Sequence, residues 1–216
     1  MTRNLYKLAV PSIKSLLINS DVDVVYLLIE DDEFPVELPR TKIINVSGQK
    51  YFKPEGPNYY GKYTYMAMMR AALPKILKES QVLSLDCDTI VDGDISALWE
   101  LPLKDYYLAA GMEPHKSIGR FYVNVGVAMF NLAKLRKDGK ADEIIDALNK
   151  TPYAFAEQDC INELCAGKIL EMPPEYNSHN WAKPTIKNPL ILHYAGFPDW
   201  RQFSGFQKYA NAEVEK

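Results

Sequence analysis

The stretch Val82-Leu83-Ser84-Leu85-Asp86-Cys87-Asp88-Thr89-Ile90-Val91 decides how the rest of the chain is interpreted. Its apolar start predicts a buried strand that stops at two aspartates spaced two residues apart. Side chains two apart on a strand point the same way, so Asp86 and Asp88 can aim two carboxylates at one point. Hard divalent cations prefer oxygen ligands, and open α/β sheets bind ligands beyond the carboxyl ends of strands. The stretch therefore predicts a metal that holds an anionic substrate.

A plain turn is the competing interpretation of the same aspartates, because Asp and Gly favour turn dihedrals. We adopt the turn for Asp92-Gly93, and we expect Asp94 to cap a short helix that begins near Ser96. For Asp86 and Asp88 both interpretations stay open on this stretch alone.

Composition narrows the class of protein. The 216 residues, with a formal net charge of −3, predict one domain over residues 1–216 with a sizeable core. Lys and Arg are scattered, which argues against a nucleic-acid or anionic-membrane partner. No apolar stretch is long enough for a transmembrane segment, and the N-terminus lacks the apolar region of a secretory signal. Three cysteines, an odd number, favour a reducing, cytoplasmic location, with Cys160 and Cys165 as small buried hydrophobes.

Apolar patterns alternate between strand and helix periods along the chain, which predicts an α/β sandwich with a largely parallel sheet. The predicted helices are residues 7–19, 63–73, 142–148 and 157–165. The predicted strands are residues 24–29, 42–46, 106–110, 125–130 and 190–193, together with the one that ends at Asp86. Residues 51–60 and 173–188 are predicted loops. Pro11 fits its helix only in the first turn, and a helix, not a strand, comes first in the chain.

Four further segments line up with the aspartate pair. They are Arg70 on the preceding helix, Asn124-Val125-Gly126, Glu157-Gln158-Asp159 and His193-Tyr194-Ala195-Gly196. Together they resemble glycosyltransferase family 8, which contains bacterial lipopolysaccharide galactosyl- and glucosyltransferases and glycogenin. The resemblance runs from about residue 6 to residue 200, and the combination is more specific than the aspartate pair alone. It implies a GT-A fold: a Rossmann-like, mixed, mostly parallel sheet flanked by helices, here expected to lack the usual first strand.

The resemblance also implies an activity. A family 8 enzyme moves a hexose from a UDP-sugar to an acceptor hydroxyl, with retention at the anomeric carbon and with Mn²⁺ (Mg²⁺ is the other candidate). Asp86 and Asp88 would bind the metal, the ribose and the diphosphate, and His193 would be the third metal ligand. A nitrogen ligand among oxygens mildly favours Mn²⁺. Taken by itself, His193 is more typical of a satisfied core histidine, and the paired aspartates reverse that preference.

Residues around the donor sugar follow from the same resemblance. Arg70 would approach the sugar and diphosphate, since a guanidinium suits an oxygen-rich target; its alternative is a solvated helix residue. Asn124 would contact the donor sugar, while Gly126 and Gly196 would let the backbone approach the ligand closely. A core strand with a bulge is the other interpretation of the Asn124 segment, and both can hold.

Glu157 and Gln158 match positions that flank the donor sugar, and with Asn124 they are the candidate catalytic residues. The family more often has Asp where Glu157 stands, so the sugar preference is expected to differ. An amide is a poor nucleophile, so we favour front-face substitution near Gln158 over a double displacement. Asp159 is expected to cap its helix.

Two departures from the family bear on nucleotide binding. Tyr6 matches an aromatic that stacks on uracil, with Arg3 and Asn4 near the base edge, although Tyr6 could instead pack in the core. The strand that normally precedes these residues is missing, by truncation or because the sheet is one strand short. A family lysine is also absent where Asp199 stands. The cations that could replace it are Lys183, Lys187 and Arg201. We expect a weakened nucleotide pocket.

Three other functions compete. A nucleotide-sugar-binding protein without turnover fits the two departures. A haloacid-dehalogenase-like phosphatase also uses an Asp-x-Asp pair, but that pair usually follows the first strand. In such a phosphatase a Thr or Val stands two residues after the second Asp, whereas here Thr89 follows Asp88 directly. A calcium loop of the EF-hand type is a weaker alternative, because it needs an oxygen ligand and a glycine at the positions where Ile90 and Val91 stand. The acceptor, whether a glycan, a lipid-linked sugar or a protein, is expected over variable loops such as residues 51–60, 112–120 and 173–188.

Overall fold

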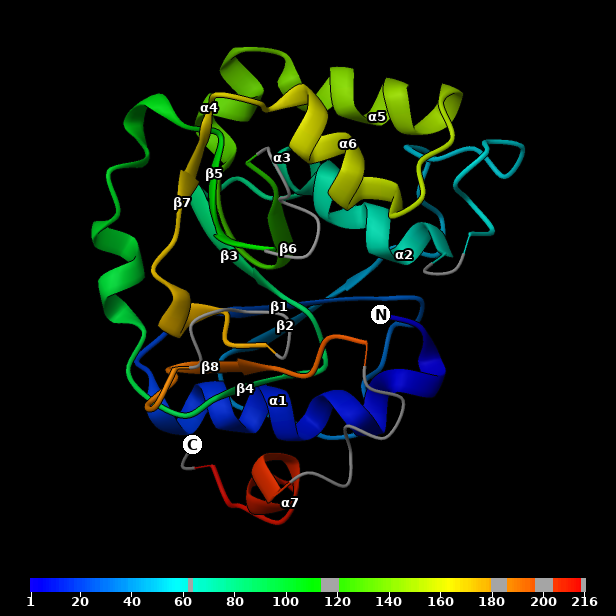
Figure 1. The fold of residues 1–216 in the computed structure, drawn as a ribbon. Coiled ribbons are helices and arrows are strands. Elements are labelled where there is room, and N and C mark those ends of the chain that lie inside the picture. The colour runs from blue at the N-terminus through cyan, green and yellow to red at the C-terminus, as the bar shows by residue number, and fades with distance from the viewer. Residues whose placement is uncertain (62–63, 114–120, 180–185, 197–203, 215–216) are drawn as a thin grey trace. The chain divides into compact units, whose positions relative to one another are not determined.

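The computed structural model describes residues 1–61, 64–113, 121–179, 186–196 and 204–214 (Figure 1). These residues form two compact units, each with its own core. Unit 1 contains Met1–Gly48, Leu85–Glu100 and Pro173–Lys216, and unit 2 contains Gln49–Ser84 and Leu101–Met172. The expectation of a single domain over residues 1–216 stays a prediction.

Unit 1 is organised around its first long helix. A 3₁₀ turn, η1 (Arg3–Leu5), leads into α1 (Tyr6–Asn19), and the first strand, β1 (Val25–Ile29), follows it. The helix buries Tyr6, Ala9, Ile13 and Leu17 against residues of β1. Pro11 lies inside α1, beyond its first turn, so the sequence expectation for Pro11 was wrong. Burial of the apolar face on both sides of Pro11 outweighs the cost of the missing backbone donor.

Two short sheets complete unit 1. β1 pairs in parallel with β2 (Thr41–Asn45). β4 (Thr89–Val91) pairs antiparallel with β8 (Ile191–His193). The 3₁₀ turns η3 (Ser96–Glu100) and η5 (Pro174–Tyr176) also belong here, and both Asp94 carboxylate oxygens accept from Ser96, as the capping prediction requires.

The last helix, α7 (Ser204–Ala210), packs on α1 within unit 1 (Figure 1). Lys14 on α1 donates from Nζ to the carbonyls of Ala210 and Ala212 at the end of α7. Asp92 accepts from Lys208 and Tyr209 on α7. A cation at the C-terminal end of a helix is favourable, so Lys14 both anchors and caps α7.

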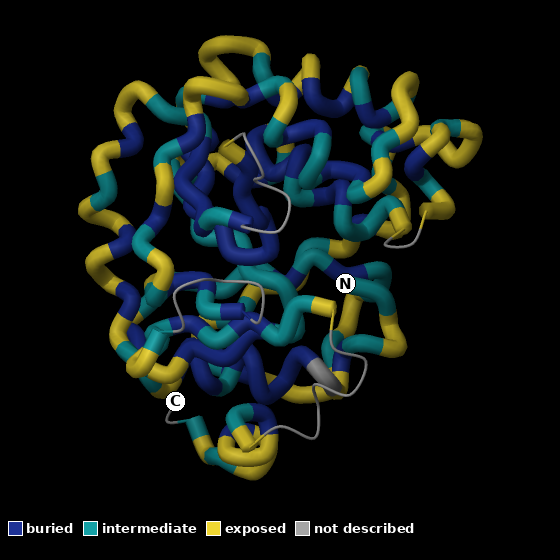
Figure 2. The backbone as a smooth tube through the Cα atoms, viewed as in Figure 1, coloured by how far each residue is buried: buried dark blue, intermediate teal, exposed yellow. Residues whose placement is uncertain are grey.

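Unit 2 is a mixed four-stranded sheet covered by helices. Its strand order is β3 (Gln81–Leu85), β6 (Val123–Asn131), β5 (Leu108–Met112) and β7 (Ile169–Glu171). β5 runs antiparallel to β6 and parallel to β7. Every residue of β6 is buried, and Figure 2 shows it as a continuous buried stretch. Such a strand has no polar face, which explains why it reads as an almost unbroken apolar run.

The helices of unit 2 are α2 (Thr64–Met68), α3 (Leu73–Ile76), α4 (Leu132–Lys137), α5 (Lys140–Lys150) and α6 (Ala156–Leu164), with 3₁₀ turns η2 (Met69–Ala72) and η4 (Leu103–Asp105). α6 packs against β6, α5 and α2. The helix expected over residues 63–73 does not stop near Pro74; it continues through η2 into α3. Pro74 lies in the first turn of α3, where a backbone N–H is not needed.

Among the described residues, no helix combines the length and the apolarity that crossing a bilayer would need.

The buried thiols confirm one prediction from composition. Cys160 and Cys165 are 0% and 1% exposed, so they pack as small hydrophobes. Burial raises the pKa of each thiol to about 12. Both thiols are therefore neutral in the folded state at physiological pH.

This burial predicts a loss of stability in alkali. An unfolded thiol ionises near its ordinary pKa of about 8.5, while the folded thiols hold their protons to about 12. Their stabilising contribution is complete below the unfolded pKa and is lost as pH rises toward the folded one. We expect the free energy of unfolding, measured in urea, to fall more steeply above pH 9 for the wild type than for a Cys160→Ala, Cys165→Ala double variant. Parallel slopes would contradict the thiol contribution.

Candidate functional site

Unit 1 brings the three predicted metal ligands together. Asp86, Asp88 and His193 each offer one ligand atom, and these atoms lie within 4.8 Å of one another. His193 Nε2 is 3.4 Å from Asp88 Oδ1 and 3.8 Å from Asp86 Oδ2. The His193 side chain is 2% exposed, whereas the Asp86 and Asp88 side chains are 37% and 22% exposed. The group is a solvent-accessible pair of carboxylates backed by a buried imidazole.

Strand pairing places these side chains. In the β4–β8 ladder, Thr89 lies opposite His193, and Tyr194 N donates to Asp88 O at 2.9 Å. Thr89 Oγ1 donates to Asp86 O at 2.8 Å, which closes the turn between β3 and β4. The turn interpretation therefore holds, and it is compatible with the metal prediction, because the turn aims the two carboxylates at His193.

The imidazole has a defined orientation. His193 Nδ1 lies 2.9 Å from Asn177 Oδ1, and both residues are buried. His193 is thus a satisfied buried histidine on one ring nitrogen, while its other nitrogen faces two carboxylates. Two carboxylates and one imidazole are a ligand set that could hold a divalent cation.

Unit 2 holds a second polar cluster. Arg70 Nε lies 3.2 Å from Glu157 Oε1, and their side chains are 10% and 7% exposed. Arg70 also donates from Nη1 to the carbonyl of Val125. The alternative that Arg70 is a solvated helix residue is therefore wrong: its charge is buried and paired.

A bulge in β6 explains why these side chains gather. The β5–β6 register changes from Ala110↔Ala128 to Gly111↔Asn124, so three residues of β6 lie between consecutive pairs. Side chains bind the displaced backbone. Gln158 Oε1 accepts from Val125 N at 3.2 Å, and Asn124 Oδ1 accepts from Gly126 N at 3.0 Å. Bulges of this kind re-aim side chains beside functional sites.

The remaining members of the α6 motif support its first turn. Asp159 accepts from Phe155 N at 2.8 Å, as expected of a capping residue, and also from Tyr122 OH. Burial, and then the hydrogen bond to Asp159, raise the pKa of Tyr122. Ala156, directly before Glu157, has a φ of +36°, which is a strained value for a residue with a Cβ.

The nucleotide-binding candidates of unit 1 are less clearly placed. Tyr6 is 5% exposed, packs against Phe34, and donates from its hydroxyl to Asp31, which also binds Arg3. Its burial supports the packing role, and stacking on a base stays a prediction. Gly196 has a φ of +77° with open space where a Cβ would be.

The candidate replacement cations are only partly visible. Lys187 is exposed, whereas Lys183, Asp199 and Arg201 lie outside the described residues.

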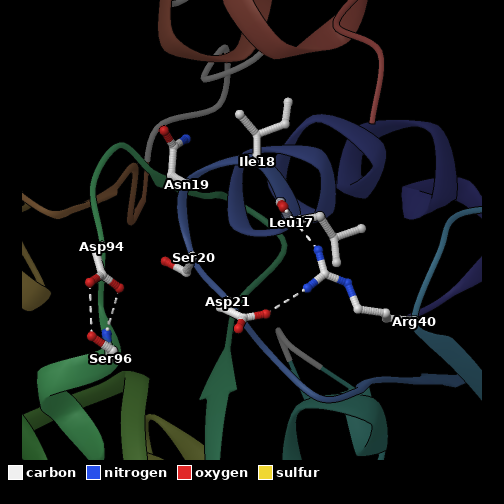
Figure 3. Close-up of a pocket in the computed structure, with 8 residues that line it drawn as sticks. All are labelled: Leu17, Ile18, Asn19, Ser20, Asp21, Arg40, Asp94 and Ser96. Carbon is white, nitrogen blue, oxygen red and sulfur yellow. Dashed lines mark hydrogen bonds and ion pairs between the residues drawn. The ribbon is translucent and has the colours of Figure 1, made fainter. Parts of the chain in front are cut away.

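A surface pocket of about 420 Å³ in unit 1 is unrelated to either cluster. It is lined by Leu17, Ile18, Asn19, Ser20, Asp21, Arg40, Asp94 and Ser96. Figure 3 shows the Arg40 guanidinium bonded to Asp21 and to the carbonyl of Leu17, at the end of α1. Asp94 is bonded to Ser96. Arg40 therefore stabilises the end of α1, and Asp94 stabilises the turn at Ser96.

Comparison with known proteins decides the family. The sequence model described as "Glycosyl transferase family 8" matches residues 12–202. The chain belongs to this family.

Several curated relatives of this family 8 chain carry glycosyltransferase names. It is 31% identical over 157 residues to Glycosyltransferase GlyE of Streptococcus pneumoniae serotype 4, a match that covers 65% of this chain and 38% of GlyE. It is 28% identical over 143 residues to the lipopolysaccharide 1,2-glucosyltransferase of Escherichia coli K12, covering 54% and 42% of the two chains. General stress protein A of Bacillus subtilis is 25% identical over 145 residues, covering 60% and 51%. The chain thus spans about half or less of the length of these relatives.

Solved structures establish the GT-A fold for this family 8 member. The crystal structure of GlyE superposes with a TM-score of 0.71 at 23% identity, covering 99% of this chain and 59% of that one. The galactosyltransferase LgtC, in complex with donor and acceptor sugar analogues, also gives 0.71 at 17% identity, covering 97% and 93%. The predicted fold class is confirmed.

Glu113 is a residue of the family 8 chain that the sequence analysis missed. It is 4% exposed, and its Oε2 accepts from Asn124 Nδ2 at 2.9 Å and from Gln158 Nε2 at 3.2 Å. It thereby fixes both amides with their oxygens toward the β6 bulge. A signal was present: Glu113 follows an apolar run that forms β5, just as Asp86 follows the run that forms β3.

The Arg70–Glu157 pair gives a stability prediction. Arg70→Met leaves the buried Glu157 carboxylate without its guanidinium, so we expect a loss of about 3–5 kcal/mol in the free energy of unfolding, measured in urea. The Arg70→Met, Glu157→Leu double variant removes both charges and should recover most of that loss. A double variant as unstable as the single one would show that the two charges are not coupled.

Glu113 gives a second stability prediction. Glu113→Leu removes the acceptor of the buried Asn124 amide and one of the two acceptors of the half-buried Gln158 amide, whose Nε2 also donates to Tyr122 OH. We expect a cost of about 1–3 kcal/mol, the typical cost of one unsatisfied buried polar group. Glu113→Gln keeps an oxygen and should cost less. Glu163→Leu, at an exposed position on α6, is the matched control, with an expected effect within about 0.5 kcal/mol. Movement of the Asn124 and Gln158 side-chain amide signals in NMR spectra of Glu113→Leu, but not of Glu163→Leu, checks the assignment.

Proposed function

We propose that this family 8 chain transfers a hexose from a UDP-sugar to an acceptor hydroxyl with retention of anomeric configuration, using Mn²⁺. The observation that carries the proposal is the group of Asp86, Asp88 and His193, whose ligand atoms lie within 4.8 Å of one another. Relatives named glycosyltransferases support the class of reaction. Donor sugar and acceptor are open.

The metal group would bind the diphosphate end of the donor. Asp86 and Asp88 present oxygens at the end of β3, and His193 contributes a buried nitrogen from β8. When bound, a divalent cation supplies Lewis-acid stabilisation of the departing diphosphate. The Asp86 and Asp88 side chains are partly exposed and would stay accessible to substrate oxygens, whereas the buried His193 would hold the metal from the protein interior.

The unit 2 cluster would bind the donor sugar. Arg70 presents a guanidinium already oriented by Glu157, and Asn124 is oriented by Glu113. The β6 bulge at Gly126 is a feature that lets backbone approach a ligand. In unit 1, Gly196 has open space where a Cβ would be. Tyr6 is retained as the candidate beside the base.

The bonding of Gln158 supports front-face substitution. Its Oε1 accepts from Val125 N and its Nε2 donates to Glu113, so the amide is engaged at both ends. A nucleophilic attack by Oε1 would need that first bond to break. We therefore assign Gln158 and Asn124 to positioning the sugar, with Glu157 holding Arg70, while the acceptor hydroxyl enters on the leaving-group side.

The loop of residues 51–60 is the proposed acceptor surface. Asn58 anchors it to α5, donating to the carbonyls of Leu148 and Thr151 and accepting from Tyr153 N. Tyr59 stacks on Tyr65 at 4.8 Å between ring centroids, and Tyr60 is 80% exposed. Amphipathic aromatic rings held on an anchored loop suit a sugar ring.

Activity is tested by UDP release. Purified protein is incubated with UDP-glucose, UDP-galactose or UDP-N-acetylhexosamines, with and without Mn²⁺, and UDP is measured. We expect metal-dependent release from at least one donor. Tight binding of UDP without release from any donor would favour the nucleotide-sugar-binding protein, and phosphate release from a generic monoester would favour the phosphatase.

Metal binding by variants tests the proposed ligands. We expect Asp86→Asn and Asp88→Asn each to lower Mn²⁺ affinity at least about 10-fold, measured by calorimetry, because even outer partners of a metal ligand are worth that much. Asp92→Asn is the matched control from the same segment, since Asp92 binds Lys208 and Tyr209 and should leave Mn²⁺ affinity unchanged. Equal Mn²⁺ affinity in all three variants would rule out this group as the metal site.

A further inference from the structure

We propose that Asn177 is a positioning residue for the metal site: its side-chain oxygen holds His193 in the tautomer that turns the Nε2 lone pair toward Asp86 and Asp88. This inference rests on the proposed metal-binding function, and it concerns a residue with no role in the sequence pattern.

The contact itself fixes the direction of the proton. Asn177 Oδ1 lies 2.9 Å from His193 Nδ1, and an amide oxygen can only accept. Nδ1 must therefore carry the hydrogen, which leaves Nε2 of a neutral ring with its lone pair. That lone pair faces Asp88 Oδ1 at 3.4 Å and Asp86 Oδ2 at 3.8 Å. An unprotonated Nε2 so placed can ligate a metal and cannot donate a hydrogen bond.

The backbone holds Asn177 in register with His193. Ser178 N donates to Ile191 O, and His193 N donates to Ser178 O, so the segment after η5 runs beside β8 through a parallel bridge between Ser178 and Leu192. These bonds leave little freedom for Asn177, which is 2% exposed, or for His193, which is 4% exposed. The pair is therefore set by strand-like bonding before any metal arrives.

A buried amide at this place has a cost that a packing role does not explain. A leucine of similar size would fill the same volume without a polar group to desolvate. The hydrogen bond from the imidazole to Asn177 Oδ1 offsets the desolvation cost of burying the amide. Partners of this kind orient the ring of a metal-binding histidine and raise its basicity, and their loss typically lowers metal affinity about 10–100-fold.

The first experiment reads the tautomer without metal or turnover. Nitrogen NMR of the metal-free wild type, recorded at a pH where the ring is neutral, reports which ring nitrogen of His193 carries the hydrogen. The sequence has three histidines, so a His193→Gln variant assigns the signal. We expect the Nδ1–H form in the wild type and its loss in Asn177→Leu. An Nε2–H form in the wild type, or an unchanged tautomer in Asn177→Leu, would overturn the inference.

The second experiment measures Mn²⁺ affinity of the same proteins by calorimetry. Asn177→Leu should bind about 10–100-fold more weakly than the wild type. Asn177→Asp keeps an oxygen acceptor and should restore most of the affinity. The matched control is Asn19→Leu, which removes another partly buried amide of unit 1 that bonds Ser15 O and Val91 O and does not contact His193. It should lower stability without changing the tautomer or the affinity.

The two experiments separate failure of this inference from failure of the proposed function. A wild type that binds no Mn²⁺ but keeps the Nδ1–H form would refute the metal site while supporting the Asn177 bond. Mn²⁺ affinity in Asn177→Leu equal to that of the wild type would refute the positioning role while leaving the metal site in place. If Asn177→Leu does not fold, the tautomer of the wild type and the affinity of Asn177→Asp still decide the matter.

Discussion

The antiparallel pairing of β4 with β8 is the constraint on which the metal group of unit 1 depends. The ladder is only three residues long on each side, yet it joins the segment after Asp88 to a segment about a hundred residues later. It sets Thr89 opposite His193, and the bond from Tyr194 N to Asp88 O extends the alignment by one residue. A shift of one residue would turn His193 to the other face of the strand and dissolve the group of ligands.

In unit 2 the corresponding constraint is the bulge in β6. A regular strand would bond the backbone of Val125 and Gly126 to β5, and Arg70, Asn124 and Gln158 would have no backbone groups to bind there. The bulge withdraws those groups from the ladder and gives them to three side chains that the family resemblance assigns to the donor sugar. The residues proposed to bind the substrate are thus also the residues that stabilise the irregular strand. Substitutions at these positions are therefore expected to change both the stability of the protein and its binding of the substrate.

Much of this arrangement could be predicted from the sequence, and the remainder depends on long-range contacts. The strand before Asp86 and the helix over α1 follow from local apolar patterns, and the proposed metal ligands follow from a resemblance that spans the chain. The strand β4 was not predicted as a separate element, because a segment of three residues is too short to show the alternating pattern of a strand. Glu113 and Asn177 were missed for another reason. Glu113 accepts hydrogen bonds from two amides, and Asn177 Oδ1 lies within hydrogen-bond distance of His193 Nδ1. The position of Glu113 after an apolar run was a signal, but no pattern in the sequence indicates which side chains these two residues contact. The continuation of the helix past Pro74 was missed because proline in a first turn looks, locally, like proline after a helix end.

The division of the chain between the two units has a consequence for how it folds. Unit 1 is assembled from Met1–Gly48, Leu85–Glu100 and Pro173–Lys216, so forming its core requires the closure of two long loops that belong to unit 2. Loop-closure entropy opposes contacts between such distant segments, and a high contact order slows folding. The last segment of unit 1, Pro173–Lys216, leaves the ribosome after all of unit 2. The strand β8 and the helix α7 can therefore reach β4 and α1 only after unit 2 has been synthesised.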